Sequence, residues 1–81
     1  MKIGVPKEIL DQECRVALTP AGTHALVSHG HSVFIENNAG LESSFSNDDY
    51  VDAGAKISPK SEDVFNIADL ILKQALIIYA V

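Results

Sequence analysis

The sequence has no tryptophan, only one cysteine and few basic residues. A single cysteine, Cys14, cannot form an internal disulfide and is typical of a reducing compartment. Six Lys and Arg against eleven Asp and Glu give a net charge of −5, which excludes the clustered positive charge that nucleic acids require. Charges at Lys2, Lys7 and Glu8 do not fit a signal peptide, and the longest uncharged tail, 74–81, is far shorter than the roughly 20 residues of a spanning helix. We expect a soluble, cytoplasmic protein that binds neither nucleic acid nor membrane.

The length limits what the chain can do alone. Its 81 residues make one small domain, and such a chain buries roughly 60% of its unfolded surface. The apolar fraction of 47% is typical of a globular protein. A domain of this size can fold, but it cannot hold both a nucleotide site and a substrate site.

Strand and helix signals alternate along the chain, as they do in a parallel sheet with crossover helices. Thr19-Pro20 and Ser46 with Asp49 are typical helix starts, and Gly30 is a typical helix end. The fold class is therefore α/β, a small three-layer sheet that is partly Rossmann-like or flavodoxin-like. We predict strands over 2–5, 32–36, 55–57 and 68–72, and helices from Pro20 to Gly30, from Ser46 to Gly54, and from Ser58-Pro59 through Phe65.

Arg15 is the first candidate for a binding residue. It ends a polar stretch that follows the first strand, just before the apolar Val16-Ala17-Leu18. Its planar guanidinium matches the two oxygens of a carboxylate. From the residues alone, however, we favour a second interpretation, a surface arginine paired with Glu13 or Asp11.

The histidines and the glycines offer no cofactor or metal site. His24, His29 and His31 are spaced five and two residues apart, which is not a compact ligand motif. The loop after the second strand, Asn38 to Glu42, lacks the G-x-G-x-x-G pattern, and Glu42 would repel a phosphate. We predict that this loop is a connection and that no residue of the chain binds metal or dinucleotide.

Several blocks in order, MKIGVPKEI, RVALTPAG, HGHSVFIENNAG, FSNDDYVDAGAKI and ADLILK, resemble the N-terminal region of alanine dehydrogenase and of the alpha subunit of pyridine nucleotide transhydrogenase. The resemblance covers 1–73, so we expect an incomplete domain over 1–73 and a divergent apolar tail over 74–81. It implies that Arg15 holds the carboxylate of alanine or pyruvate, with Lys73 as a weaker candidate. The family's second substrate lysine would stand at Ala75, and its catalytic histidine would lie beyond Val81. We therefore expect no catalytic residue in this chain.

The resemblance implies an oxidoreductase that converts L-alanine, NAD and water to pyruvate, ammonium and NADH. The family's full-length proteins are oligomeric and use NAD, but this chain alone is expected to be inactive and to bind no NAD. Two alternatives stay open: an N-terminal fragment of a transhydrogenase alpha subunit, or a non-catalytic chain, which is either the remnant of a broken gene or a small module that binds a full-length paralogue. The uncharged tail predicts self-association, because apolar residues at an open sheet edge favour aggregation. On this view, deleting residues 75–81 would improve solubility.

Overall fold

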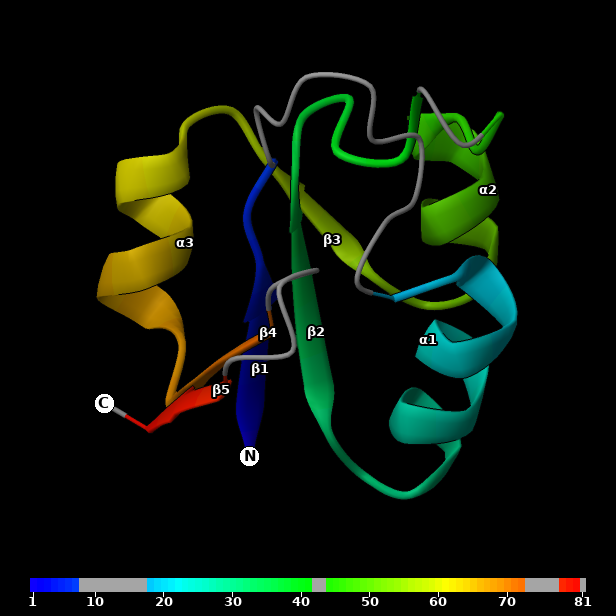
Figure 1. The fold of residues 1–81 in the computed structure, drawn as a ribbon. Helices are drawn as coiled ribbons and strands as arrows, with labels where there is room; N and C mark the ends of the chain where they lie inside the picture. The colour runs from blue at the N-terminus through cyan, green and yellow to red at the C-terminus, as the bar shows by residue number, and fades with distance from the viewer. Residues whose placement is uncertain (8–17, 42–43, 73–77, 81) are drawn as a thin grey trace.

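The computed structural model describes residues 1–7, 18–41, 44–72 and the backbone of 78–80. One five-stranded sheet has the order β3-β2-β1-β4-β5. Helices α1 and α2 lie on one side of the sheet and α3 on the other (Figure 1). The elements are β1 (Lys2–Val5), α1 (Pro20–Ser28), β2 (Ser32–Glu36), α2 (Asn47–Asp52), β3 (Lys56–Ser58), α3 (Ser61–Ile67), β4 (Leu70–Leu72) and β5 (Ile78–Ala80).

The first four strands run parallel, which confirms the predicted α/β class. From β1 the chain moves outward to β2 and β3, and then returns to β4 on the other side of β1. Because a right-handed crossover in the opposite direction places its helix on the opposite face, the reversal explains why α3 lies across the sheet from α1 and α2. The predicted three layers follow from this reversal.

Local chemistry explains where α1 and α2 begin. The Thr19 hydroxyl accepts a hydrogen bond from the Gly22 N–H at 3.1 Å, and Pro20 occupies the first helical position. Ser46 and Asp49 form a reciprocal capping box, with the Ser46 N–H donating to Asp49 Oδ2 at 2.9 Å. Both helix starts are as predicted.

The start of the third helix was predicted wrongly. Ser58 is the last residue of β3, where it pairs with Glu36, and its carbonyl accepts from the Asn37 N–H at 2.8 Å. Since these ladder contacts hold Ser58 in the sheet, α3 begins only at Ser61, with Lys60 as an N-cap that makes no side-chain hydrogen bond. The third strand is accordingly 56–58 instead of 55–57, and the fourth is 70–72 instead of 68–72.

The backbone of 78–80 forms a separate strand that runs antiparallel to β4, with Ile71 paired to Tyr79. The described part of the predicted apolar tail is thus a strand of its own. A strand at this position occupies the hydrogen-bonding edge of β4. The predicted self-association is not tested by this arrangement.

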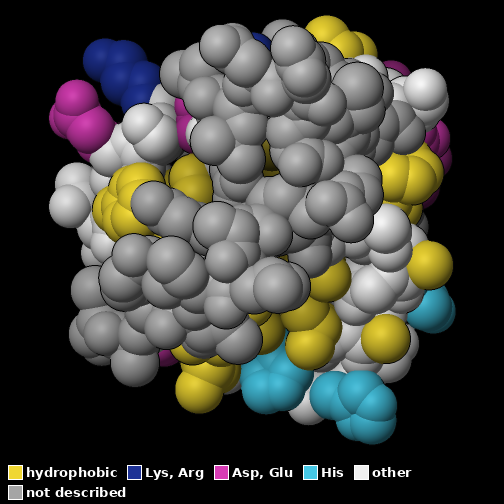
Figure 2. All heavy atoms as spheres, in the orientation of Figure 1, with side chains coloured by type: hydrophobic (Ala, Val, Ile, Leu, Met, Phe, Trp, Pro, Cys, Tyr) yellow, Lys and Arg dark blue, Asp and Glu magenta, His cyan; other side chains and the backbone are white. Residues whose placement is uncertain are grey.

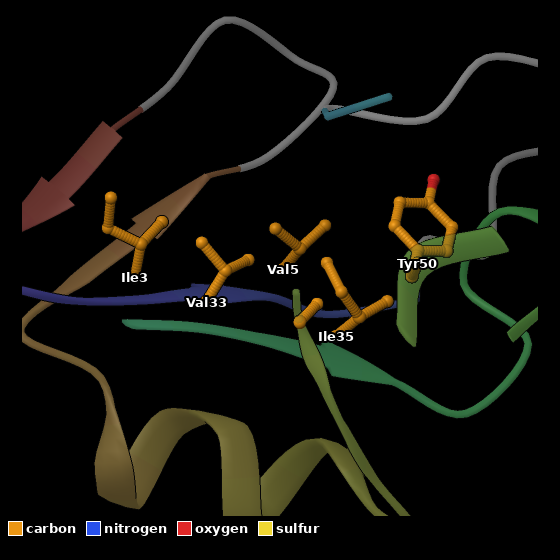
Figure 3. Close-up of a cluster of buried hydrophobic side chains, with 6 residues drawn as sticks. Ile3, Val5, Val33, Ile35 and Tyr50 are labelled. Carbon is orange, nitrogen blue, oxygen red and sulfur yellow. The ribbon is translucent and has the colours of Figure 1, made fainter. Parts of the chain in front are cut away.

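The core has one cluster on each face of the sheet. On the α1 and α2 face, aliphatic side chains of β1 and β2 form a row that ends at the ring of Tyr50 (Figure 3). On the α3 face, Val64, Ala68 and Ile71 pack together. Gly4 faces this second cluster because successive strand residues point to opposite sides. The first cluster consists of Ile3, Val5, Val33, Ile35, Tyr50 and Ala55.

The longest helix in the described part of the chain, α1, has nine residues. No helix among those described has the length and apolar character needed to cross a membrane.

Candidate functional site

The carboxyl ends of β1 and β4 mark the candidate site. The two strands are neighbours, with Ile3 beside Leu70 and Gly4 beside Ile71. The chain leaves β1 toward β2 on one side, whereas β4 lies on the other side. In open α/β sheets, ligands bind outside the carboxyl ends of the strands at such a switch in strand order.

Both predicted substrate-binding residues belong to segments that leave this edge. Arg15 lies in 8–17, the segment between β1 and α1, and Lys73 directly follows β4. Arg15, Lys73 and Ala75 all lie outside the described residues, so their roles stay predictions. The described residues that flank these segments are Lys7, Leu18 and Leu72.

Lys7 and Leu18, which flank the Arg15 segment, each contact a side chain from elsewhere in the fold. The Lys7 N–H donates to Glu36 Oε1 at 2.7 Å. The Tyr50 hydroxyl donates to the Leu18 carbonyl at 2.8 Å. Glu36 ends β2 and Tyr50 belongs to α2, so two separate elements contact the two ends of one segment.

Tyr50 is held from several sides. Its side chain is fully buried, and the Phe45 ring meets it edge-on with centroids 6.2 Å apart. A Cβ atom at Gly40 would lie 2.5 Å from the Tyr50 hydroxyl oxygen, so only glycine lets the loop after β2 pass this close to the ring. Burial raises the pKa of Tyr50 to about 12, with a further contribution from the nearby Asp49 carboxylate. Tyr50 therefore remains a hydrogen-bond donor at neutral pH.

The described part of the loop after β2 turns toward the start of α2. Asn38 has a positive φ of 62°, and its N–H donates to Asn47 Oδ1 at 2.9 Å. The Asn47 amide in turn donates to Asn37 Oδ1 at 2.7 Å. These bonds fasten the turn to the start of α2.

The histidines lie away from this edge. In Figure 2 histidine side chains gather at the lower edge of the molecule, where α1 ends and β1 begins. His24 and His29 are exposed, and His31 Nδ1 lies 3.4 Å from the amino group of Met1. Within the described part of the chain, no group of three or more His, Cys, Asp or Glu residues could hold a metal ion.

A family model described as alanine dehydrogenase/PNT, N-terminal domain matches residues 4–76. The chain belongs to this family. Among solved structures, an L-alanine dehydrogenase superposes with a TM-score of 0.85 and 46% sequence identity, over 90% of this chain and 20% of the other. A transhydrogenase from Sinorhizobium meliloti gives a TM-score of 0.82 and 34% identity, over 90% of this chain and 21% of the other.

Curated relatives agree with this assignment. An alanine dehydrogenase of Methanococcus maripaludis is 52% identical over 73 residues, which are 90% of this chain and 20% of the relative. One from Staphylococcus epidermidis is 51% identical over 73 residues, again 90% of this chain and 19% of the relative. The chain thus spans about a fifth of the length of these relatives.

Sequence reasoning did not single out Glu36, Gly40 or Tyr50 as parts of the site. Tyr50 stands in the FSNDDY block on which the resemblance depends, and an aromatic residue with a hydroxyl at the core edge is a usable signal. Its partner Leu18 is 32 residues away in sequence, so the contact itself could not be found without the fold. Glu36 carried the weaker signal of an acidic residue at a strand end.

Proposed function

We propose that this chain is the substrate-carboxylate-binding part of an alanine dehydrogenase, with Arg15 as the anchor and Lys73 as a weaker second candidate. The whole enzyme would interconvert L-alanine, NAD and water with pyruvate, ammonium and NADH, in the cytoplasm. The membership of the alanine dehydrogenase/PNT family carries this proposal. The position of β1 and β4 at the switch in strand order supports it, because the segments with Arg15 and Lys73 follow these two strands.

The role of Arg15 is orientation. A guanidinium that binds both carboxylate oxygens fixes how the α-carbon of the substrate is presented, and such positioning lowers the barrier to reaction. We place no proton transfer on the residues of this chain, because the resemblance puts the catalytic histidine beyond Val81. The protein alone is therefore expected to form no NADH from alanine and NAD above a blank.

The residues do not fit NAD. The sequence has no G-x-G-x-x-G motif, and the loop after β2 packs Gly40 against the Tyr50 side chain, where a Cβ would already be only 2.5 Å from the hydroxyl oxygen. That glycine therefore serves internal packing against Tyr50 and not the close approach of a pyrophosphate. We derive no cofactor step from this chain and propose that it does not bind NAD.

Pyruvate binding tests the proposal. One charge-assisted anchor contributes at most about 3 kcal/mol, which corresponds to a Kd in the millimolar range or weaker. In an NMR titration at constant ionic strength, pyruvate should shift signals of the labelled chain, whereas Arg15→Ala should abolish these shifts. Arg15→Lys keeps the charge but loses the planar fork, so it should bind more weakly than the wild type.

Two controls separate a site from general attraction of anions. Lys2→Ala removes one positive charge at the start of β1, the opposite end of the strand from Lys7, and should leave binding unchanged. Pyruvamide has the shape of pyruvate without its negative charge and should not bind. Equal pyruvate-induced shifts in Arg15→Ala and the wild type would remove Arg15 from the site.

The transhydrogenase alpha subunit is the second candidate, supported by the structural match at 34% identity. The alanine dehydrogenases are more similar, at 46% for a solved structure and 52% for a curated relative.

A third candidate is a non-catalytic interaction module. The DNA after codon 73 would help to separate it, since a Lys-Glu-Pro block in another reading frame would indicate an interrupted dehydrogenase gene. We also propose that the whole protein is oligomeric and that this chain alone self-associates.

A further inference from the structure

The two edges of the sheet differ in how open they are to another chain. In the described part of the chain, the strand order β3-β2-β1-β4-β5 places β3 and β5 at the outside. An edge strand presents backbone N–H and C=O groups that pair readily with a further strand, unless charges, proline or a short length prevent it. Which edge can take a partner therefore depends on the residues and backbone groups on its open side.

The edge at β3 is protected. The Ser58 carbonyl accepts from the N–H of Asn37, which follows β2, at 2.8 Å, so Ser58 directs its backbone groups toward β2. Because these groups alternate in direction along a strand, Lys56 also faces β2, and of the three residues of β3 only Ile57 faces outward. Lys56 and the two residues after β3, a proline and a lysine, are exposed, and both charge and proline disfavour pairing at an edge.

The hydrogen bonds of β1 show which way the backbone groups of β4 point. The Met1 carbonyl accepts from the Ser32 N–H of β2 at 2.9 Å. Because the groups alternate along a strand, Met1 and Ile3 direct theirs to β2 and away from β4. Ile3 pairs with Leu70 in the parallel ladder, where only one residue of each pair directs its groups to the other strand. Leu70 therefore faces β1, and Ile71 faces β5.

The same alternation identifies the open groups of β5. Ile71 pairs with Tyr79, and two residues opposite each other in an antiparallel ladder direct their groups either both inward or both outward. Tyr79 therefore faces β4, whereas Ile78 and Ala80 direct their N–H and C=O groups to the open side. The segment 74–81 contains no charged residue, proline or glycine, so this edge lacks the protection that β3 has.

We propose that the partner at this edge is a second copy of this chain, whose β5 pairs antiparallel with the first. This inference rests on the self-association proposed above and names its surface. An antiparallel strand pair has two-fold symmetry, so one strand can be its own partner and the contact closes at two copies. With Ile78 of one copy opposite Ala80 of the other, every outward group of β5 is paired. Two five-stranded sheets then form one continuous sheet.

The charge of the chain favours this edge over the rest of the surface. Each copy carries a net charge of −5, so association brings like charges together. The repulsion is smallest where the segments in contact carry no charge, as they do here. Strands of three residues bury little surface, which is typical of a weak, concentration-dependent dimer. Added salt screens the repulsion, so the dimer should become more stable as the ionic strength rises.

Sedimentation equilibrium of the full chain at several concentrations tests the proposal. Ala80→Pro removes one outward N–H, and proline is tolerated in an edge strand when its nitrogen faces the open side. A symmetric contact loses this group on both copies, so the Kd of the dimer should rise roughly ten- to hundredfold. Ala80→Val is the matched control, because it enlarges the side chain but keeps the N–H, and its Kd should stay close to that of the wild type.

Amide hydrogen exchange followed by NMR gives a second measurement. In the wild type, exchange at Ile78 and Ala80 should slow as the protein concentration rises, because their N–H groups become paired only in the dimer. The Tyr79 amide faces β4 and should be protected already in dilute samples. Protection of Tyr79 in Ala80→Pro shows that β5 still pairs with β4 in this variant.

The outcomes separate this inference from the proposed self-association. If the wild type is monomeric at every concentration, both fail. If Ala80→Pro keeps the protection of Tyr79 and associates as strongly as the wild type, self-association stands and the β5 edge is overturned. If that protection is lost, the wild type decides alone, and equal exchange rates of Ile78 and Ala80 in dilute and concentrated samples overturn the inference. Growth of the wild type beyond two copies overturns the closed dimer.

Discussion

Replacing Gly4 with alanine should separate β1 from α3 and destabilise the fold. A Cβ atom at Gly4 would lie 2.6 Å from Val64 Cγ1 and 2.8 Å from Ala68 Cβ. Carbon atoms normally pack about 3.5–4.0 Å apart. Ala68 has no side-chain torsion that could move its Cβ away, and the χ1 torsion of a helical valine is restricted. The clash can therefore be relieved only by shifting the helix.

The expected magnitude is the balance of two opposing effects. Overpacking a core costs about 1–3 kcal/mol, and two rigid contacts place this site near the upper end. Gly4 lies in an extended strand, so alanine also restricts the unfolded chain and returns up to about 1 kcal/mol. The net loss of about 2 kcal/mol should lower the melting temperature by roughly 8–16 °C in a domain of this size.

Thermal and urea unfolding followed by circular dichroism would measure this loss. Gly22→Ala is the matched contrast, because its new Cβ would meet Leu18 Cδ1 at 2.8 Å, the movable end of a side chain. Alanine is also the better residue inside a helix, so Gly22→Ala should be neutral or stabilising. Val64→Ala should partly rescue Gly4→Ala, with a coupling of about 1 kcal/mol. A Gly4→Ala variant within 0.5 kcal/mol of the wild type, a bound below the ordinary cost of overpacking, would refute the reasoning.

Three further changes test other parts of the structure. The pKa of Tyr50 is raised from 10.0 to about 12, so its protonated form stabilises the fold fully below pH 10, and this stabilisation is lost as the pH rises through about 12. Between these pH values, the free energy of unfolding should therefore fall less in Tyr50→Phe than in the wild type. Equal losses of stability in alkaline unfolding curves would contradict the prediction. Ala75→Lys restores the lysine that the family resemblance places there, and it should tighten pyruvate binding by roughly three- to tenfold. An unchanged Kd in the NMR titration would exclude position 75 from substrate binding. Truncation after residue 77 removes β5 and exposes the edge of β4, so we expect the truncated protein to be less soluble, not more soluble as the apolar tail alone suggested. Size-exclusion chromatography of both proteins at equal concentration would reveal the association. A monodisperse truncated protein would contradict the prediction.

The sequence predicted best those features that depend on neighbouring residues. Thr19 with Pro20, and Ser46 with Asp49, marked the starts of α1 and α2 because a cap acts within three or four residues. Ser58-Pro59 carried an equally local helix signal, but the pairing of Ser58 with Glu36 outweighed it. A strand ladder between segments 22 residues apart cannot be inferred from a capping motif.

The candidate site was predicted only in part, for a similar reason. Arg15 and Lys73 were chosen from residue chemistry and family resemblance, and the fold adds that their segments follow adjacent strands. The hydrogen bonds of Glu36 and Tyr50 join residues about 30 positions apart. The close approach of Gly40 to Tyr50 likewise depends on how a loop lies over a helix. Such contacts exist only once the sheet has been assembled.

The direction of β1 has a practical consequence for labelling the protein. Met1 is 61% exposed and its carbonyl accepts from the Ser32 N–H at the foot of the sheet (Figure 1). Six residue-to-residue steps of extended chain separate it from Lys7, which amounts to about 20 Å. A fluorophore, affinity tag or surface linker joined ahead of Met1 would leave the molecule at the edge opposite the carboxyl ends of β1 and β4. Protein immobilised in this way would present its candidate carboxylate-binding edge to the solution.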